Sequence, residues 1–387
     1  MSPPALRTLA AAAVVAAAAL AALAPRASAQ EYKEQFKDEI LVKGAKAPLT
    51  GVEITLDSYE RLEWKSKSGG AQKKDAAEIL SVTYGDAPVH YQRGLEASRA
   101  GRFAEAAEQF RGIAAAVAAG RSRRFWEARG LAYQADSLRR QAAAEKNPAR
   151  FLEAARMFED ALQKDPKSPI LDMVYEGIAE SKAGGGDGNG ALKALDEFRS
   201  TSAAVGRSVW EATARWVRGR VLDRQGETAG AANEYGDLAA FAATKAAAAP
   251  ADSVERRELE RLKVAGLVGR GWALFAKAEK TKAPADLDAA KAFFEGLPRD
   301  AGGSVAGKAA SLNGIGAVLL AQGKAREALE KFVEVEVTMF AVPDEVTRAL
   351  WYKAQALGRL GNNAGRDSAL RDLVEYYPWS EWAARAR

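Results

Sequence analysis

Two hydrophobic patterns divide the chain. Between Asp38 and Gly85, short apolar runs alternate with polar residues or continue over a few positions, a pattern typical of β-strands. From Asp86 to the C-terminus, apolar residues recur every three or four positions, as on one face of an α-helix. The pattern therefore predicts a small β-rich module in residues 30–85 and a helical region in residues 86–387.

The β-rich module is expected to contain four short strands separated by turn residues, at Glu39–Val42, Gly51–Leu56, Arg61–Lys65 and Ile79–Tyr84. Short strands of this kind suit a small antiparallel barrel or an open sheet. So small a module buries little surface alone, so we expect it to pack against the helical region.

The helical region repeats a glycine, a second glycine, an alanine and an aromatic residue. Counted from Gly316, the later three lie 7, 12 and 16 residues on, and the same offsets recur from Gly94 and Gly219. A small residue on one helix lets a second helix approach, and a glycine beyond its end accepts the left-handed conformation. Alanine and the aromatic, four residues apart, share one face of the second helix. The three sets are Gly94, Gly101, Ala106, Phe110; Gly219, Gly226, Ala231, Tyr235; and Gly316, Gly323, Ala328, Phe332.

This pattern resembles the tetratricopeptide repeat, whose signature combines W-x2-L-G-x2-Y, A-x3-F and a proline. The resemblance implies a mainly α fold: a right-handed α-solenoid of about seven helix pairs, preceded by the small antiparallel β module. Weaker copies begin near Gly177, Gly271 and Leu357, the second with Ala289 and Phe293 on its second helix. The fullest copy is Trp126, Gly130, Tyr133, Ala154, Phe158, Ala161 and Pro166, with an insert that includes residues 141–147.

A last short helix is expected at the C-terminus, where Ser380 could cap it. Trp379 and Trp382 could then cover the apolar end of the last pair. A solenoid needs such a cap because each unit buries its face only against a neighbour.

The N-terminus has the features of a secretory signal. Arg7 precedes an apolar run from Leu9 to Leu23, and Ala27-Ser28-Ala29 forms a cleavage site before Gln30. The run is short for a membrane span of about 20 residues. We therefore expect residues 1–29 to be removed, leaving an exported, periplasmic bacterial protein without a transmembrane segment.

Composition restricts the chemistry of the remaining chain. It holds 54 basic and 51 acidic residues, too even a balance to indicate nucleic-acid binding. It lacks cysteine and its only histidine is His90, so a zinc site of the His/Cys type cannot be assembled. The loop from Gly184 to Gly190 has too few oxygen ligands for calcium and is expected to be a flexible connection. We therefore expect no cofactor, no metal and no enzyme activity.

Candidate binding residues follow from the resemblance. In tetratricopeptide proteins the first helix of each pair lines a concave groove, and aromatic and arginine side chains supply most hot spots of recognition. The alternative is that some of these tryptophans pack between neighbouring helices. The positions implied are Tyr91, Trp216, Arg220, Trp272, Trp351 and Gln355.

These observations predict a non-catalytic scaffold of the bacterial cell envelope that binds a protein or peptide partner in the groove. Two alternatives stay open. One is an envelope enzyme or glycan-binding protein that uses a tryptophan-lined groove. The other is a self-assembling envelope subunit.

Overall fold

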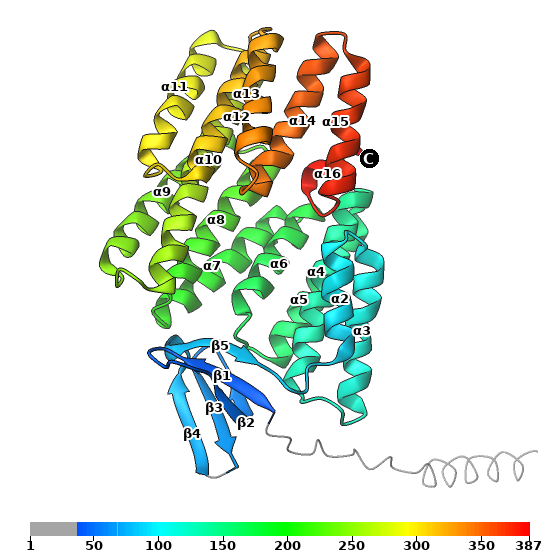
Figure 1. The fold of residues 1–387 in the computed structure, drawn as a ribbon, viewed down its shortest axis with the longest axis vertical. Coiled ribbons are helices and arrows are strands. Elements are labelled where there is room, and N and C mark those ends of the chain that lie inside the picture. The colour runs from blue at the N-terminus through cyan, green and yellow to red at the C-terminus, as the bar shows by residue number, and fades with distance from the viewer. Residues whose placement is uncertain (1–36, 68) are drawn as a thin grey trace, which may run out of the picture.

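The computed structural model describes residues 37–67 and 69–387. A five-stranded antiparallel sheet lies at one end of the molecule and the helices form the rest (Figure 1). The strands are β1 (Asp38–Val42), β2 (Leu49–Asp57), β3 (Arg61–Ser66), β4 (Gly69–Asp75) and β5 (Ile79–Thr83), with a short 3-10 helix, η1 (Ala76–Glu78), before β5.

The sheet is open, with strand order β4-β3-β2-β1-β5. One of its faces carries an apolar core that includes Ile40, Ile54 and Trp64. The sequence analysis missed β4 because its sequence, GGAQKKD, has no apolar alternation and lies almost entirely exposed. Strand β4 is held by pairing with β3, which no pattern within its own residues could reveal.

The helices from α2 to α15 form seven antiparallel pairs, and α16 follows them, which confirms the predicted solenoid preceded by a β module. Their bounds are α2 (Val89–Arg99), α3 (Phe103–Ala118), α4 (Phe125–Glu145), α5 (Pro148–Lys164), α6 (Leu171–Gly184), α7 (Gly188–Ala204), α8 (Ser208–Gln225), α9 (Thr228–Ala248), α10 (Val254–Thr281), α11 (Pro284–Asp300), α12 (Val305–Ala321), α13 (Ala325–Thr338), α14 (Pro343–Arg359), α15 (Asn363–Tyr376) and α16 (Glu381–Ala386).

The repeated glycines are packing positions. A Cβ atom added at Gly316 would lie 2.6 Å from the Phe332 ring, and one at Gly94 would lie 2.5 Å from Phe110. Gly323, after the first helix of its pair, has φ +82°. The spacing of small and aromatic residues therefore encodes close contact within a helix pair, as predicted.

The fifth pair corrects one assignment by a single residue. The sequence analysis placed Ala289 and Phe293 on the packing face of α11. In the structure Ala290 and Phe294 are fully buried instead, and a Cβ at Gly271 would lie 2.6 Å from Phe294. Two adjacent phenylalanines make either register plausible from sequence, and only contact with α10 and α12 selects one.

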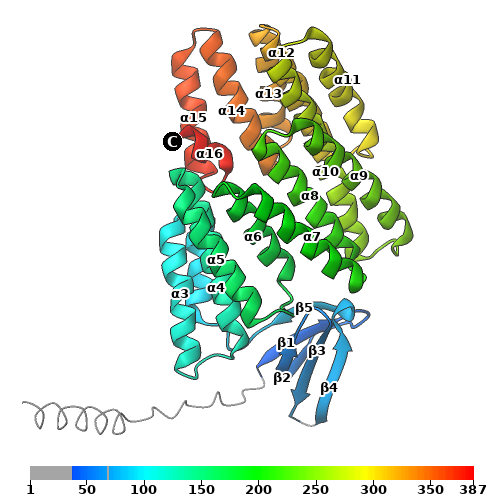
Figure 2. The same cartoon turned by 180° about the vertical axis from the view of Figure 1, so that it is seen from behind.

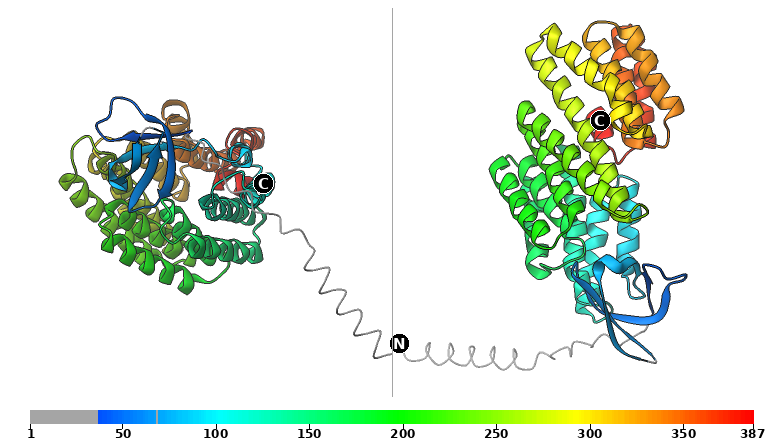
Figure 3. Two further views of the ribbon diagram at one scale, coloured as in Figure 1. Left: turned by 90° about the horizontal axis from the view of Figure 1, so that it is seen from below. Right: turned by 90° about the vertical axis from the view of Figure 1, so that its left-hand side faces the viewer.

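The first helices of the pairs form an inner layer that closes on itself. From α4 to α14, each first helix contacts the next, and α16 contacts both α14 and α4. Views from behind and from below show the pairs winding around until the C-terminus returns to the first two pairs (Figures 2 and 3). Ser380 caps α16 by accepting a hydrogen bond from the backbone N–H of Ala383, as the sequence predicted.

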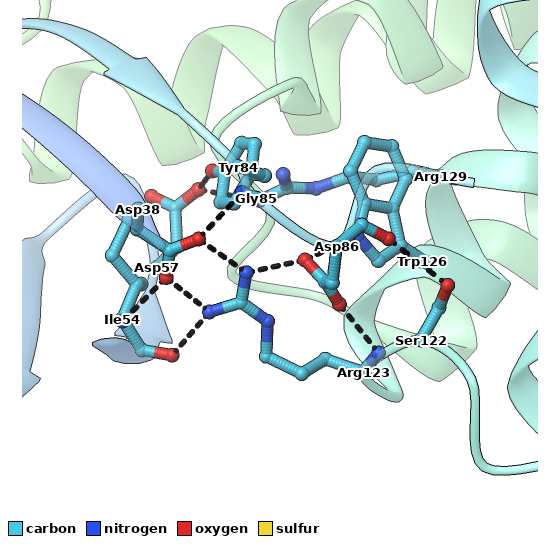
Figure 4. Close-up of polar contacts among 10 residues, drawn as sticks. All are labelled: Asp38, Ile54, Asp57, Tyr84, Gly85, Asp86, Ser122, Arg123, Trp126 and Arg129. Atoms are coloured by element: carbon cyan, nitrogen blue, oxygen red, sulfur yellow. Dashed lines mark hydrogen bonds and ion pairs between the residues drawn. The ribbon is translucent and has the colours of Figure 1, made fainter. Parts of the chain in front are cut away.

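Buried charges fix the sheet to the solenoid (Figure 4). Arg123, just before α4, donates to Asp38 of β1 at 2.5 and 2.8 Å, to the Ile54 carbonyl at 2.8 Å, and to Asp86. The side chains of Asp38 and Asp86 are 4% and 1% exposed. Separating the sheet from the helices would leave these charges unpaired, so the sheet is held in one orientation.

The predicted signal segment, residues 1–29, lies outside the described residues. Within the part of the chain that is described, no helix combines the length and the apolar character needed to cross a membrane.

Candidate functional site: the inner wall of the solenoid

All six candidates lie on first helices of pairs, and all six are half-buried. The structure distributes them over four helices, and only the two that share α8 and the two that share α14 lie one turn apart. Tyr91 lies on α2, Trp216 and Arg220 on α8, Trp272 on α10, and Trp351 and Gln355 on α14.

Trp216 and Arg220 are neighbours one turn apart on α8. The guanidinium of Arg220 lies 4.7 Å from the centre of the Trp216 ring, within cation–π range. Arg220 also reaches α6, where its Nη2 lies 2.7 Å from Glu180 and its Nη1 lies 3.5 Å from Glu176. This pair therefore belongs to a charge cluster that joins two inner helices.

Glu180 is the centre of that cluster. Its residue is 2% exposed, and it binds Arg139 of α4 as well as Arg220 of α8. Arg224 donates to the Glu180 backbone carbonyl at 3.0 Å. Burial opposes ionisation of Glu180, but Arg220, Arg139 and Arg224 outweigh it and lower its pKa. Glu180 is thus an ionised carboxylate whose ion pairs with Arg139 and Arg220 connect α4, α6 and α8.

Glu176 lies one turn before Glu180 and behaves in the opposite way. Burial, together with repulsion from Glu180, raises the pKa of Glu176 to about 7, against the weaker attraction of Arg220 and Arg139. The side chains of Glu176 and Arg220 remain 29% and 33% exposed. The accessible part of the inner wall therefore offers one cation, one carboxyl group that binds a proton near neutral pH, and the exposed part of the Trp216 ring, the rest of which packs against apolar residues of neighbouring helices.

The pKa of Arg220 also depends on the C-terminal helix α16. Burial disfavours its charge, but Glu180 and Glu176 raise its pKa, and Glu381 at the start of α16 adds a smaller contribution of the same sign. Glu381 also acts on Arg224. The middle of the inner wall thus lies within electrostatic range of the last helix, more than a hundred residues away in sequence.

Trp272 is mainly a packing residue. Its ring stacks on Tyr352 of α14, with centres 5.6 Å apart and planes at 14°, and Arg348 covers it at 4.5 Å. It also contacts Phe294 at 5.4 Å. Its Nε1 is buried and has no hydrogen-bond partner among the described residues. These contacts hold α10, α11 and α14 together and leave little of the ring for a partner.

Trp351 and Tyr91 lie at the two ends of the solenoid. Trp351 packs against Trp382 of the cap, with ring centres 6.0 Å apart. Tyr91 contacts Trp126 at 5.0 Å and Tyr133 at 5.2 Å. Trp351 is therefore largely a contact for the cap, whereas Tyr91 belongs to the joint between the helices and the sheet. Gln355 lies one turn after Trp351 on the same helix.

Sequence reasoning identified Arg220 but missed the charged residues around it. Glu176 and Glu180 are four residues apart, as are Arg220 and Arg224, so each pair shares one helix face. That spacing was visible in the sequence. Their placement opposite one another was not, because it depends on how α6 packs against α8.

The residues considered for catalysis or metal binding have structural roles. His90 Nδ1 lies 3.1 Å from the Gln109 side-chain oxygen. The glycine-rich segment near Asp187 is not the flexible loop that was expected. It is a tight turn in which Asp187 caps α7 by accepting from the Gly190 backbone N–H. Over residues 37–67 and 69–387, no group of three or more histidine, cysteine or acidic side chains has the arrangement of a metal site.

Comparison with known proteins adds little to this geometry. No family model and no curated protein matches the chain. Among solved structures, the chain is similar to a Rap protein complexed with Competence and Sporulation Factor, with 14% identity, coverage of 77% of this chain and 76% of that chain, and a TM-score of 0.42. It is also similar to BtubC from P. vanneervenii, with 12% identity, coverage of 74% of this chain and 90% of that chain, and a TM-score of 0.36. A third similar structure is the P58(IPK) TPR domain, with 14% identity, coverage of 77% of this chain and 76% of that chain, and a TM-score of 0.25. At these TM-scores the likeness carries no argument, so the assignment to a tetratricopeptide-like solenoid rests on the helix pairs themselves.

Proposed function

We propose that this protein is a non-catalytic scaffold that binds a protein or peptide partner on the inner wall of its solenoid. The observation that supports this is the cluster of Trp216, Arg220 and Glu176. These side chains come from two adjacent inner helices and stay partly exposed, and Arg220, which lies against the Trp216 ring, is held in place by the buried Glu180. Tryptophan and arginine dominate recognition hot spots, and fixing them in advance reduces the ordering cost of binding.

The chemistry of the cluster defines the partner. Arg220 can donate to a carboxylate, and Glu176 can accept from a cationic or hydroxyl-bearing side chain. The Trp216 ring supplies apolar area beside both. A segment with polar side chains of both signs around an apolar residue would satisfy all three groups, whereas a purely apolar segment would leave Arg220 and Glu176 unpaired.

The proposed location of the protein is the periplasm. The support is the sequence of residues 1–29, with its apolar run and A-x-A site. Mass spectrometry of the native protein should find Gln30 as the first residue. A membrane-bound chain that still begins at Met1 would contradict export by cleavage.

The test of the binding site uses Trp216→Ala. In a pull-down from envelope extract followed by affinity measurement, this variant should lose about 2 kcal/mol or more of binding free energy. Because the ring also packs against apolar residues of neighbouring helices, the variant's free energy of unfolding should fall as well, so the affinity is measured per folded molecule. The matched control is Trp351→Ala, another half-buried tryptophan of an inner helix, which should lose stability through its contact with Trp382. If Trp216→Ala instead cost roughly 3–5 kcal/mol of stability and left affinity per folded molecule unchanged, Trp216 would be a packing residue.

One observation favours a second candidate, a glycan hydrolase. Glycoside hydrolysis commonly uses two carboxyl groups whose pKa values the environment separates, and Glu176 and Glu180 are such a pair. However, Glu180 is buried and bound by two arginines, which leaves no side for a substrate or water. Incubation with cell-wall glycans should therefore release no reducing ends. If the wild type released reducing ends and Glu176→Gln did not, the protein would be a glycan hydrolase and the scaffold proposal would be wrong.

A further inference from the structure

A pocket lies where the sheet meets the solenoid, apart from the inner-wall cluster. Its volume is about 480 Å³. Strand β5 forms one side, and the other sides come from α2, α4, the connection before α6 and the turn before α8. The pocket combines apolar surface with converging polar groups, which is the usual composition of a ligand site.

The two edges of the sheet differ in character. The β4 edge carries Lys73 and Lys74, the kind of charge that prevents further strand pairing. The β5 edge reads ILSVT, without charge or proline, and Leu80 within it is 48% exposed. In residues 37–67 and 69–387, the backbone hydrogen bonds of β5 within the sheet go to β1 alone. Strand β5 is therefore an uncharged sheet edge with strong strand propensity.

The pocket borders this edge along its whole length. All five residues of β5 line it, although successive side chains of a strand point to opposite faces. Contact with both faces means that the space adjoins the strand's edge, where its main-chain groups point, as well as one face. An extended backbone placed there would form hydrogen bonds with β5 and direct alternate side chains into the pocket.

Arg207 gives the pocket a positive group. Its guanidinium donates to the Tyr59 backbone carbonyl and lies 4.8 Å from the Trp210 ring, and it takes part in none of the ion pairs found among the described residues. Burial lowers its pKa, and the negative charges of Asp75 and Asp172 act against this without forming an ion pair with it. By contrast, the other arginine of the pocket, Arg129, is paired with Asp57 at 2.5 Å.

The joint keeps the pocket in a fixed shape. Asp57 at the end of β2 accepts from both Arg129 and the Tyr84 hydroxyl, and Arg123 ties β1 to the segment before α2 (Figure 4). Burial raises the pKa of Tyr84 well above its usual value, so its hydroxyl stays protonated and keeps donating. These buried hydrogen bonds and ion pairs thus hold the sheet, and with it the β5 edge, in a fixed position beside the pocket.

We propose that the β5 edge and this pocket bind an extended peptide segment of a partner protein, which adds a strand to the sheet. The segment places an apolar side chain in the pocket beside Leu80 and a carboxylate on Arg207. This site is independent of the inner-wall cluster, and it gives the β module a role of its own in recognition.

The test selects peptides from a phage-displayed library of random linear peptides against the mature chain. Enriched sequences should alternate apolar and polar residues and carry a carboxylate. A synthetic copy of one such peptide should bind about tenfold or more weakly to Leu80→Lys and to Arg207→Gln, since each removes a charge-assisted or apolar contact. When the peptide binds, hydrogen exchange should show new protection of those amides in residues 79–83 that point away from β1. Trp216→Ala should bind this peptide normally, so failure of the inner-wall proposal would leave this one standing.

The controls are Leu49→Lys, at an exposed leucine of β2 that does not line the pocket, and the exposed Arg299→Gln. Both should bind like the wild type. Equal affinity of the peptide for all variants would overturn the proposal. So would a selection in which Leu80→Lys removes unwanted binders beforehand and no peptide sequence is then enriched on the wild type. Protection, without peptide, of the β5 amides that point away from β1 would mean that the edge is already occupied and would also overturn the proposal. A dimer in sedimentation that Leu80→Lys dissociates would assign the edge to a second copy of the chain.

Discussion

Environment, not residue type, separates the two glutamates of the inner wall. Glu176 and Glu180 lie on one face of α6, yet the pKa of one is raised and that of the other lowered. Glu180 lies between arginines from two helices. Glu176 has only the longer contact with Arg220, at 3.5 Å, and it is also repelled by the negative charge of Glu180. Because Glu180 is paired with the arginines, Glu176 keeps its proton to higher pH.

This asymmetry predicts a pH-dependent stability effect for Glu176→Gln. Because the pKa of Glu176 is raised from 4.5 to about 7 in the folded state, the wild type loses stability from this group as pH rises through that window. The loss is complete above about pH 7. Glutamine cannot ionise, so the variant should gain about 1–3 kcal/mol relative to the wild type between pH 5 and pH 8.5. Chemical denaturation at a series of pH values measures this difference.

The same series gives the control. Glu180→Gln should destabilise at every pH in that range, because it leaves Arg139 and Arg220 without their shared partner. A constant difference between Glu176→Gln and the wild type from pH 5 to pH 8.5 would mean that Glu176 titrates normally.

At the level of the helix pair, small residues determine how closely the helices approach. Ala328 of α13 is fully buried, as is Phe332 one turn later, and Gly316 of α12 contacts the Phe332 ring. These positions leave no spare volume, since even the Cβ that glycine lacks would overlap the ring. The repeated small residues are therefore required for close packing of the two helices, and larger side chains at these positions should be poorly tolerated.

Ala328→Phe should lower the free energy of unfolding by about 1–3 kcal/mol, because overpacking forces the two helices apart. In a stack of units that contact mainly their neighbours, the damage should be greatest from α12 to α15. Hydrogen exchange resolved by segment measures both effects. Equal loss of protection across residues 86–387 would be inconsistent with units that unfold one by one. Lys331→Ala on the outer side of α13, with its side chain 37% exposed, is the control and should change little.

At the scale of the whole molecule, the C-terminal cap turns a stack of pairs into a closed arrangement. Besides covering α14 through Trp382, α16 contacts α4, and Pro378 lies against Gly101 in the turn after α2. Figure 1 shows α16 seated between the last pair and the ends of the first two. The first and last repeats therefore support each other directly, which an open solenoid does not allow.

Deletion of residues 378–387 should open this arrangement. The variant exposes Trp351 and the end of α4, and it removes Glu381 from the surroundings of Arg220. Small-angle X-ray scattering should show a larger radius of gyration, and hydrogen exchange should increase in the turn around Gly101 as well as in α14 and α15. Arg387→Ala, which keeps the cap, should behave like the wild type. An unchanged radius with exchange altered only in the last pair would show that the cap serves α14 and α15 alone.

Local rules determined much of this protein from the sequence. The glycine-to-aromatic spacing gave the helix pairs because close packing leaves few residue types at those positions, and Ser380 marked the last helix because an N-cap needs a side-chain oxygen. The change of period near Gly85 separated strands from helices. The candidates Trp216 and Arg220 followed from the repeat register and lie one turn apart on α8, and their role in binding stays a prediction.

The rest depends on contacts between residues far apart in the chain. Strand β4 exists because β3 pairs with it, and Phe294 rather than Phe293 is buried because α10 and α12 enclose that side of α11. Sequence could not show that Glu180 would meet arginines from two other helices, nor that the cap would return to α4. Periodicity and capping act within a few residues and are written in the local sequence. The charge cluster, the joint of the sheet and the closure of the inner layer arise only when separate elements pack together, so the tertiary structure alone decides them.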